Sequence, residues 1–269
     1  MKRFVVLDKK IGETPLMALT AWKHAHPAYQ DVPAAYAGRL DPMASGKLLV
    51  LLGDTCKEQS RYTGLDKEYE VSVLLDVESD TGDTLGIPSY GGLESHPYRA
   101  RILEALAAEL GSRSHEYPPY SSKTVNGTPL FLHALRGTLH TITIPTHTET
   151  IHAITLVHAY QADSDFIRNY IQEALSSVPR DDSPSKELGA DFRQDAIRAA
   201  WQELFDTMPA RTFVVLKLRV VCGSGAYMRT LAERIGRTLG TSALALSIHR
   251  TKVGTYRRLG PIHFFLPSF

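Results

Sequence analysis

The sequence predicts an α+β fold, in which strands and helices are mixed along one chain. Residues 47–53 and 212–222 are apolar or alternating runs of strand length. Residues 99–110 and 226–239 instead carry apolar side chains at helical spacing, and a glycine follows each segment. Helices and strands do not follow one another in the strict alternation of a parallel βαβ sheet.

The N-terminal part begins with an apolar strand at 4–7. A helix follows, with Thr14 as its N-cap and Pro15 at its first position, and it ends before Pro27. After the strand at 47–53, residues 68–77 alternate well enough to form another strand.

The middle of the chain contains the helix at 99–110 and then the Tyr-Pro-Pro-Tyr segment at 117–120, which interrupts regular structure. Residues 121–137 are expected to form an exposed loop with a short helix. We expect strands at 141–144 and 151–160.

Two helices, at 166–178 and 192–208, flank a polar loop at 179–189. The strand pattern resumes at 212–222, so this acidic helical pair is interpreted as an insertion between strands. After the helix at 226–239, a strand is expected at 243–253.

Composition is that of an ordinary globular protein, with 269 residues, 43% hydrophobic residues and a formal net charge of +1. No apolar run is long enough for a membrane-spanning helix, and the first residues lack a signal-peptide core. The two cysteines, Cys56 and Cys222, form no CxxC pair. We therefore expect a cytoplasmic protein with reduced cysteines, and the motifs predict no metal and no cofactor.

Charge is segregated along the chain. Residues 163–206 contain ten acidic and five basic residues, whereas residues 209–269 contain ten Lys or Arg and one acid, Glu233. A basic face is typical of nucleic-acid binding, although an ordinary solvated surface would show the same pattern.

The segment 37–46 is a candidate site. Asp41 precedes Pro42, which keeps it out of helical conformation, and glycines on both sides permit tight turns. Arg39 lies close enough in sequence to contact a phosphate or the carboxylate. Such an aspartate can present a catalytic group or simply stabilise its own turn.

A second candidate is the segment 222–231, where a strand leads through two glycines into a helix that begins near Tyr227 and Arg229. Backbone N–H groups at such a helix start can bind an anion, but a simple glycine-rich connection has the same pattern. The third candidate is the segment 66–69, which opens a strand and ends in Tyr69; a half-buried strand tyrosine has the same pattern.

Taken together, these segments resemble the TruB-type tRNA pseudouridine synthases. Five segments carry the resemblance, in the order in which that family has them: GRLDPMASGKLLV at 38–50 with GDTCK at 53–57, DKEY at 66–69 with DTGD at 80–83, YPPYSSKTVNG at 117–127, GAYMRTL at 225–231 and HRTKVG at 249–254. Tyr36 stands where the family has a histidine.

The resemblance implies a mixed, largely antiparallel sheet flanked by helices. It implies one catalytic domain over 1–269, with a thumb at about 117–140, the acidic insertion at about 163–208 and no C-terminal RNA-binding domain.

The resemblance also implies site residues. Asp41 would be the nucleophile, and Arg229 would pair with it and orient it. Tyr69, the third catalytic residue, would stack on the flipped uracil and serve as, or position, the base that removes a proton. Substrate contacts would come from Tyr36, Arg39, Lys123, Tyr227 and Ile248.

The implied reaction converts uridine 55 in the T-arm of tRNA to pseudouridine on a flipped-out base. It requires no cofactor, no metal and no obligatory protein partner. Two alternatives remain: the same reaction on another RNA such as ribosomal RNA, or a non-catalytic protein that binds or folds RNA.

Overall fold

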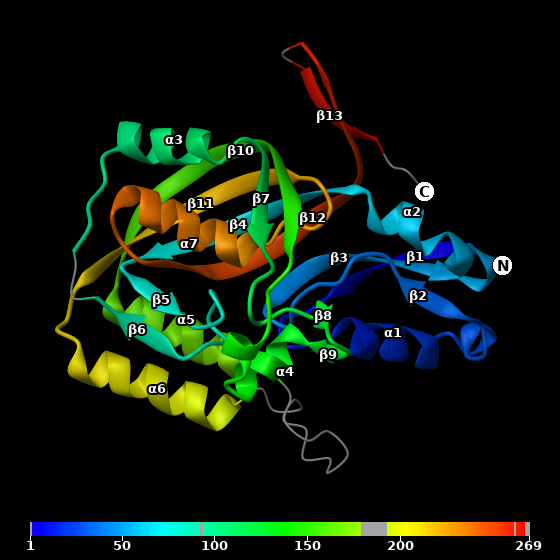
Figure 1. Cartoon of the computed structure of the whole chain (residues 1–269), viewed down its shortest axis with the longest axis horizontal. Coiled ribbons are helices and arrows are strands. Elements are labelled where there is room, and N and C mark those ends of the chain that lie inside the picture. Colours follow the sequence, from blue (N-terminus) through cyan, green and yellow to red (C-terminus); the bar gives the residue numbers. More distant parts are fainter. Residues whose placement is uncertain (1, 92–93, 179–192, 261, 267–269) are drawn as a thin grey trace.

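A computed structural model describes residues 2–91, 94–178, 193–260 and 262–266. One mixed sheet runs through it in the order β1-β3-β12-β4-β11-β10-β7, with β2 beside β3 and β13 beside β12 (Figure 1). The strands of this sheet are β1 (Phe4–Lys9), β2 (Ala34–Tyr36), β3 (Ala44–Leu52), β4 (Asp66–Leu75), β7 (Gly111–Glu116), β10 (Thr146–Asp163), β11 (Thr212–Cys222), β12 (Ala243–Leu259) and β13 (Ile262–Leu266). Every pairing in it is antiparallel except that of β12 with β3, so the predicted α+β class is confirmed.

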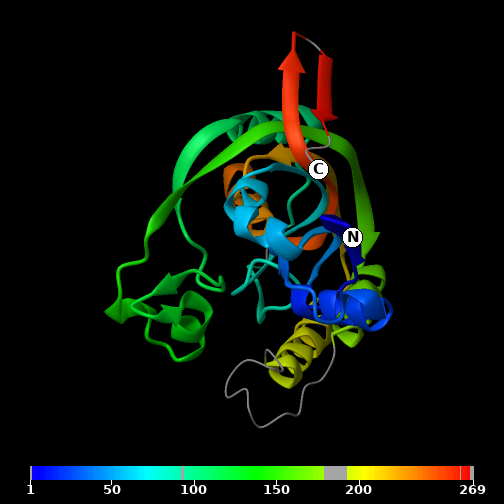
Figure 2. The ribbon, with the colours of Figure 1, turned by 90° about the vertical axis from the view of Figure 1, so that its right-hand side faces the viewer.

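Helices cover both faces of the sheet. They are α1 (Pro15–His24), α2 (Gln59–Thr63), α3 (Arg99–Ala108), α4 (Leu130–Leu135), α5 (Ser164–Ser176), α6 (Gln194–Thr207) and α7 (Met228–Leu239). Two small two-stranded sheets lie apart from the main sheet: β5 (Val77–Ser79) with β6 (Pro88–Tyr90), and β8 (Thr124–Val125) with β9 (Thr128–Pro129). Figure 2 shows the green segment with α4, and the red hairpin of β12 and β13, extending from the sheet in different directions.

The alternation of side chains along β11 divides the core between the two faces. Leu216, Leu218 and Val220 pack in the cluster that contains residues of α3 and α7. Phe213 and Val215 point the other way, into the cluster that contains residues of α5 and α6. The central strands are therefore buried on both sides.

The one parallel pairing lies next to the turn that carries Asp41. Ala44 at the start of β3 is in register with Ile248 of β12. Gly46 follows with φ +100, and a Cβ atom there would lie 2.3 Å from the carbonyl oxygen of Arg250. Only glycine permits this close approach, which brings β12 against the Asp41 turn.

Most predicted elements are confirmed, with shifted ends. Thr14 caps α1, because its Oγ1 accepts a hydrogen bond of 3.1 Å from the backbone N–H of Met17. The predicted helices at 166–178 and 192–208 correspond to α5 and α6, and the polar loop at 179–189 lies outside the described residues. The strand at 262–266 was not predicted.

The predicted strand at 141–144 is wrong. Leu139–Thr141 forms a 3-10 turn, and β10 begins only at Thr146. Pro145 explains the delay, since it has no N–H to donate. Its carbonyl oxygen accepts a bond of 3.1 Å from Tyr117, just before the β7–β10 ladder starts.

A buried ion pair joins the end of β4 to the start of β11. Arg211 donates from Nη2 to Asp76 Oδ2 at 2.6 Å, and both side chains are almost fully buried. Asp76 Oδ1 also accepts a bond from Thr241 Oγ1, just after α7, and the backbone of Asp76 is left-handed with φ +71. This pair therefore ties three connections of the fold together.

We expect Asp76→Asn to lower the free energy of unfolding by about 3 kcal/mol or more, because Arg211 would stay buried beside a neutral amide. Asparagine tolerates the left-handed backbone, so the change removes mainly the charge. Urea denaturation measures the loss. The control is Asp54→Asn, which alters a surface ion pair in which the side chains of Asp54 and Lys57 are 93% and 82% exposed. An equal loss of unfolding free energy in both variants would contradict the explanation.

Candidate active site

Two neighbouring cavities, of about 320 and 250 Å³, meet at Asp41. Both are lined by residues of the Asp41 turn and by Ser121 and Ser122, which precede the β8–β9 hairpin. The Asp41 side chain is 39% exposed, so its carboxylate is accessible from the cavities. The turn thus presents a carboxylate at the junction of two concave sites.

The turn before Asp41 is held by Arg250, which is 1% exposed. Its Nε donates to the carbonyl oxygen of Lys47 at 2.6 Å, while Nη1 and Nη2 donate to those of Arg39 and Gly38 at 3.3 and 3.2 Å. The sequence predicted no role for Arg250, although it lies inside one of the recognised segments.

Lys9 holds the turn after Asp41. Its ammonium is buried and donates to the carbonyl oxygens of Lys10 at 2.8 Å and Pro42 at 3.3 Å. Burial lowers the pKa of Lys9 to about 8, although the carboxylates of Glu13 and Asp41 favour its charged form. The sequence analysis also missed this residue, since a lysine at a strand end is usually exposed.

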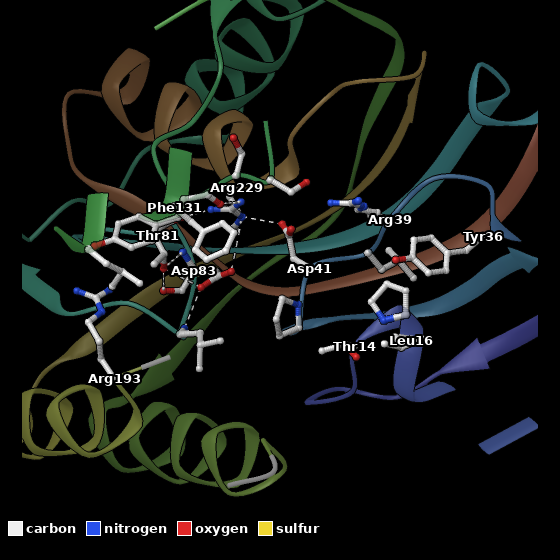
Figure 3. A pocket seen from close by; sticks show the side chains of 18 residues that line it. Thr14, Leu16, Tyr36, Arg39, Asp41, Thr81, Asp83, Phe131, Arg193 and Arg229 are labelled. Carbon is white, nitrogen blue, oxygen red and sulfur yellow. Dashed lines mark hydrogen bonds and ion pairs between the residues drawn. The ribbon is translucent and has the colours of Figure 1, made fainter. Parts of the chain in front are cut away.

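Arg229 is the main partner of the carboxylate (Figure 3). Its Nε donates to Asp41 Oδ2 at 2.8 Å and lies 3.7 Å from Asp83 Oδ2, and its side chain is only 4% exposed. Its two terminal nitrogens donate to the carbonyl oxygens of Thr81 and Tyr120. Burial disfavours the charge of the guanidinium, but the two carboxylates outweigh it and raise the pKa of Arg229.

Asp83 is a second carboxylate that the sequence analysis did not assign. Its Oδ1 accepts bonds from Thr81 Oγ1 at 2.8 Å and from the Leu85 N–H at 2.9 Å. Burial raises the pKa of Asp83, whereas Arg229 opposes that shift. Arg229 therefore lies between one accessible carboxylate and one buried carboxylate.

The smaller cavity contains the predicted aromatic and aliphatic residues. Tyr69 of β4 and Ile248 of β12 are 8% and 5% exposed, and Tyr227 lines the same cavity. Burial raises the pKa of Tyr69, and burial together with the Asp41 carboxylate raises the pKa of Tyr227 to about 12. Both phenols are therefore neutral near pH 7.

Lys67, another residue not predicted, lines the smaller cavity beside these rings. Its ammonium donates to the carbonyl oxygen of Thr63 at 2.7 Å. Burial, reinforced by the nearby charge of Arg250, lowers the pKa of Lys67 to about 8.

The remaining predicted residues lie farther out. Tyr36 lines the larger cavity, and Arg39 lines both (Figure 3). Lys123 is exposed and lines neither cavity; its ammonium lies 5.1 Å from the centre of the Tyr117 ring. The structure therefore brings seven of the eight predicted residues to the two cavities: Tyr36, Arg39, Asp41, Tyr69, Tyr227, Arg229 and Ile248.

The backbone donor at Tyr227, where α7 starts, already has an internal acceptor. It donates to Glu149 Oε1 at 3.2 Å, and Glu149 is 3% exposed. The anion at this helix start is thus a side chain of the protein.

Within the described residues, no group of three or more His, Cys, Asp or Glu side chains is arranged to hold a metal ion. Among the helices that the structure describes, none is both long enough and apolar enough to cross a membrane.

The lowered pKa of Lys9 predicts a pH-dependent stability difference. Between pH 8 and 10.5 the unfolded chain binds more protons at Lys9 than the folded protein, so unfolding becomes harder as the pH rises. The free energy of unfolding, relative to that of Lys9→Met, should increase by roughly 2–3 kcal/mol over this range. Urea denaturation at several pH values tests it. Lys10→Met is the control. If the unfolding free energy of the wild type relative to Lys10→Met increased by the same amount over this pH range, the assignment to Lys9 would be contradicted.

Comparison with known proteins shows the family of this chain. The family model described as TruB family pseudouridylate synthase (N terminal domain) matches residues 28–172, more than half of the chain. The tRNA pseudouridine synthase B of Aromatoleum aromaticum is 28% identical over 252 residues, covering 94% of this chain and 63% of the relative. The enzyme of the same name from Xanthomonas campestris pv. campestris is 28% identical over 257 residues, covering 94% and 64%.

The chain thus spans less than two thirds of the length of these curated relatives. Among solved structures, a chain in the crystal structure of a Cbf5-Nop10-Gar1 complex matches with a TM-score of 0.54 and 16% identity, over 93% of this chain and 48% of that chain. This likeness supports the fold. The family model covers more than half of the chain, Asp41 included, and the chain therefore belongs to the TruB family of pseudouridylate synthases.

Proposed function

We propose that the protein isomerises uridine 55 in the T-arm of tRNA to pseudouridine, with Asp41 as the nucleophile. One observation carries the proposal: in a TruB-family chain, an accessible Asp41 carboxylate lies where two cavities meet and is paired with the buried Arg229. The relatives named tRNA pseudouridine synthase B support tRNA as the substrate. The proposed place of action is the cytoplasm.

The reaction breaks the N1–C1′ glycosidic bond, rotates the uracil and forms a C5–C1′ bond. The proton at C5 is lost and N1 gains one, so no group is added or removed. Asp41 starts this sequence by attack on the sugar or on the base ring. Arg229 holds the carboxylate in one orientation through its 2.8 Å bond.

The smaller cavity is the proposed uracil site. Extruding the base from its stack costs a few kcal/mol by general estimate. Stacking on an aromatic ring such as Tyr69 contributes roughly 1–3 kcal/mol. Ile248 and Tyr227 form neighbouring walls of the same cavity. Tyr36, at the larger cavity, is proposed to fill the space that the base leaves in the RNA.

RNA docking is assigned to two parts of one proposed catalytic domain. Residues 117–140, which include Lys123 and α4, are proposed as a thumb over the RNA. Residues 163–208 are proposed to be an insertion between strands, and they are given no part in docking. Arg257 and Arg258 are exposed on the β12–β13 hairpin, where they are proposed to contact phosphates.

Asp41→Asn should abolish pseudouridine formation, lowering the rate by roughly 1000-fold or more, because an amide is not a nucleophile here. Primer extension on a modified tRNA transcript, after carbodiimide treatment, reports a stop next to uridine 55. Asp54→Asn, a change at an exposed side chain, is the matched control. Full activity of Asp41→Asn would overturn the mechanism, and stops only in ribosomal RNA would overturn the substrate.

Replacing both Arg257 and Arg258 with alanine should weaken binding of every tRNA to a similar extent, because phosphate contacts do not read sequence. The slope of log affinity against log salt should fall in magnitude by about 2, roughly one for each lost contact. Filter binding at several salt concentrations measures both quantities. An unchanged slope would show that the RNA docks elsewhere.

A further inference from the structure

We propose that Arg193, at the start of helix α6 in the insertion, is a positioning residue for catalysis. It holds the two backbone segments that fix Arg229 against Asp41. The inference rests on the proposed function and deepens it, since it assigns a role in the reaction to a segment outside the recognised motifs.

Two carbonyl groups from different parts of the chain hold Arg229. Its Nη1 donates to the carbonyl oxygen of Thr81, in the loop between β5 and β6, and its Nη2 donates to that of Tyr120 at 2.9 Å, at the start of the thumb segment. The direction of Nε toward Asp41 therefore depends on where these two segments lie.

Arg193 contacts both segments at once. Its guanidinium makes two bonds to Asp80, the neighbour of Thr81, with Nη1 at 2.7 Å from Oδ2 and Nη2 at 3.2 Å from Oδ1. The same guanidinium lies 4.9 Å from the centre of the Tyr120 ring. A bidentate ion pair and a cation–π contact, made by one planar group, fix their relative positions.

Tyr120 and Asp80 are also joined directly. The Tyr120 hydroxyl donates to Asp80 Oδ2 at 3.0 Å. Burial, with a further contribution from the Asp80 carboxylate, raises the pKa of Tyr120 to about 12, so the phenol keeps its proton near pH 7. Arg193, Asp80 and Tyr120 thus form a closed set of three contacts behind Arg229.

Helix α6 gives Arg193 a fixed base. Trp201, eight residues farther along the chain in this helix, is 2% exposed and donates from Nε1 to the carbonyl oxygen of Thr84 at 3.0 Å. The backbone of Arg193 has φ +59, a conformation that a non-glycine residue adopts at a cost. The contacts of its side chain offset that cost.

Figure 3 shows Arg193 on the far side of Thr81 and Asp83 from Asp41. It therefore acts on the carboxylate through Arg229 and the two segments. Because its side chain is 28% exposed and lines the larger cavity, a direct contact with RNA is the rival explanation that the experiment must separate.

Arg168 offers a matched control inside the insertion. It donates to Asp206 Oδ1 at 3.1 Å and to the Phe205 carbonyl oxygen at 2.9 Å, and its guanidinium lies 5.3 Å from the Phe205 ring. Its contacts resemble those of Arg193 in kind, but none of these partners belongs to the thumb or the Asp80 loop.

The experiment measures the single-turnover rate of pseudouridine formation and the Kd for tRNA in wild type, Arg193→Ala, Arg193→Lys and Arg168→Ala. Arg193→Ala should slow the single-turnover rate by about 10-fold with Kd within about twofold, because orientation is lost and not binding. Arg193→Lys, which keeps the charge near Asp80, should recover part of the rate. Arg168→Ala should retain the wild-type rate.

Weaker tRNA binding with an unchanged saturating rate in Arg193→Ala would overturn the proposal in favour of direct RNA contact. Equal slowing in Arg168→Ala would overturn it in favour of a general loss of stability.

Hydrogen exchange separates this proposal from the proposed function. Amides at 80–83 and 120–123 should exchange faster in Arg193→Ala than in Arg168→Ala, whatever the RNA substrate is. Equal exchange in the two variants would overturn the role of Arg193. Absence of pseudouridine with the wild type would instead overturn the proposed function alone.

Discussion

The buried guanidinium of Arg229 is the interaction on which the site depends. It connects the Asp41 turn, the loop between β5 and β6, and the start of the thumb segment through one planar group. A buried charge of this kind is stable only when nearly all its donors are satisfied. The same bonds that satisfy the guanidinium therefore bring three distant segments together around one carboxylate.

Other buried cations surround the same turn. Arg250 donates to the carbonyl oxygens of Gly38 and Arg39, before Asp41, and Lys9 donates to that of Pro42, after it. Lys67 lines the smaller cavity together with Arg250. Burial lowers the pKa of both lysines, so the protein pays an electrostatic cost to keep them there. Their donors fix the turn, and their positive charge favours an anionic group at its centre.

Different helices cover the two faces of the sheet. On one face, α7 carries Arg229 and packs with α3 against β4 and β11. On the other face, α5 and α6 cover the β11 side chains that alternate with these, such as Phe213 and Val215. Helix α6 nevertheless reaches the loop that carries Asp83, because Arg193 donates to Asp80 and Trp201 donates to the carbonyl oxygen of Thr84. Residues outside the recognised motifs thus contact a loop that belongs to one of them.

The sequence by itself determined the features that depend on neighbouring residues. The cap at Thr14 and the turn at Asp41 follow from side chains within a few positions, and the motif order identified the family. The strand expected at 141–144 failed because Pro145, which has no N–H to donate, stands just before Thr146, the first residue of β10 that pairs with β7. The contacts of Arg250 and Arg193 were decided only by the tertiary structure. They join residues more than 70 positions apart, and such pairs form only after the strand register and the docking of α6 have placed them.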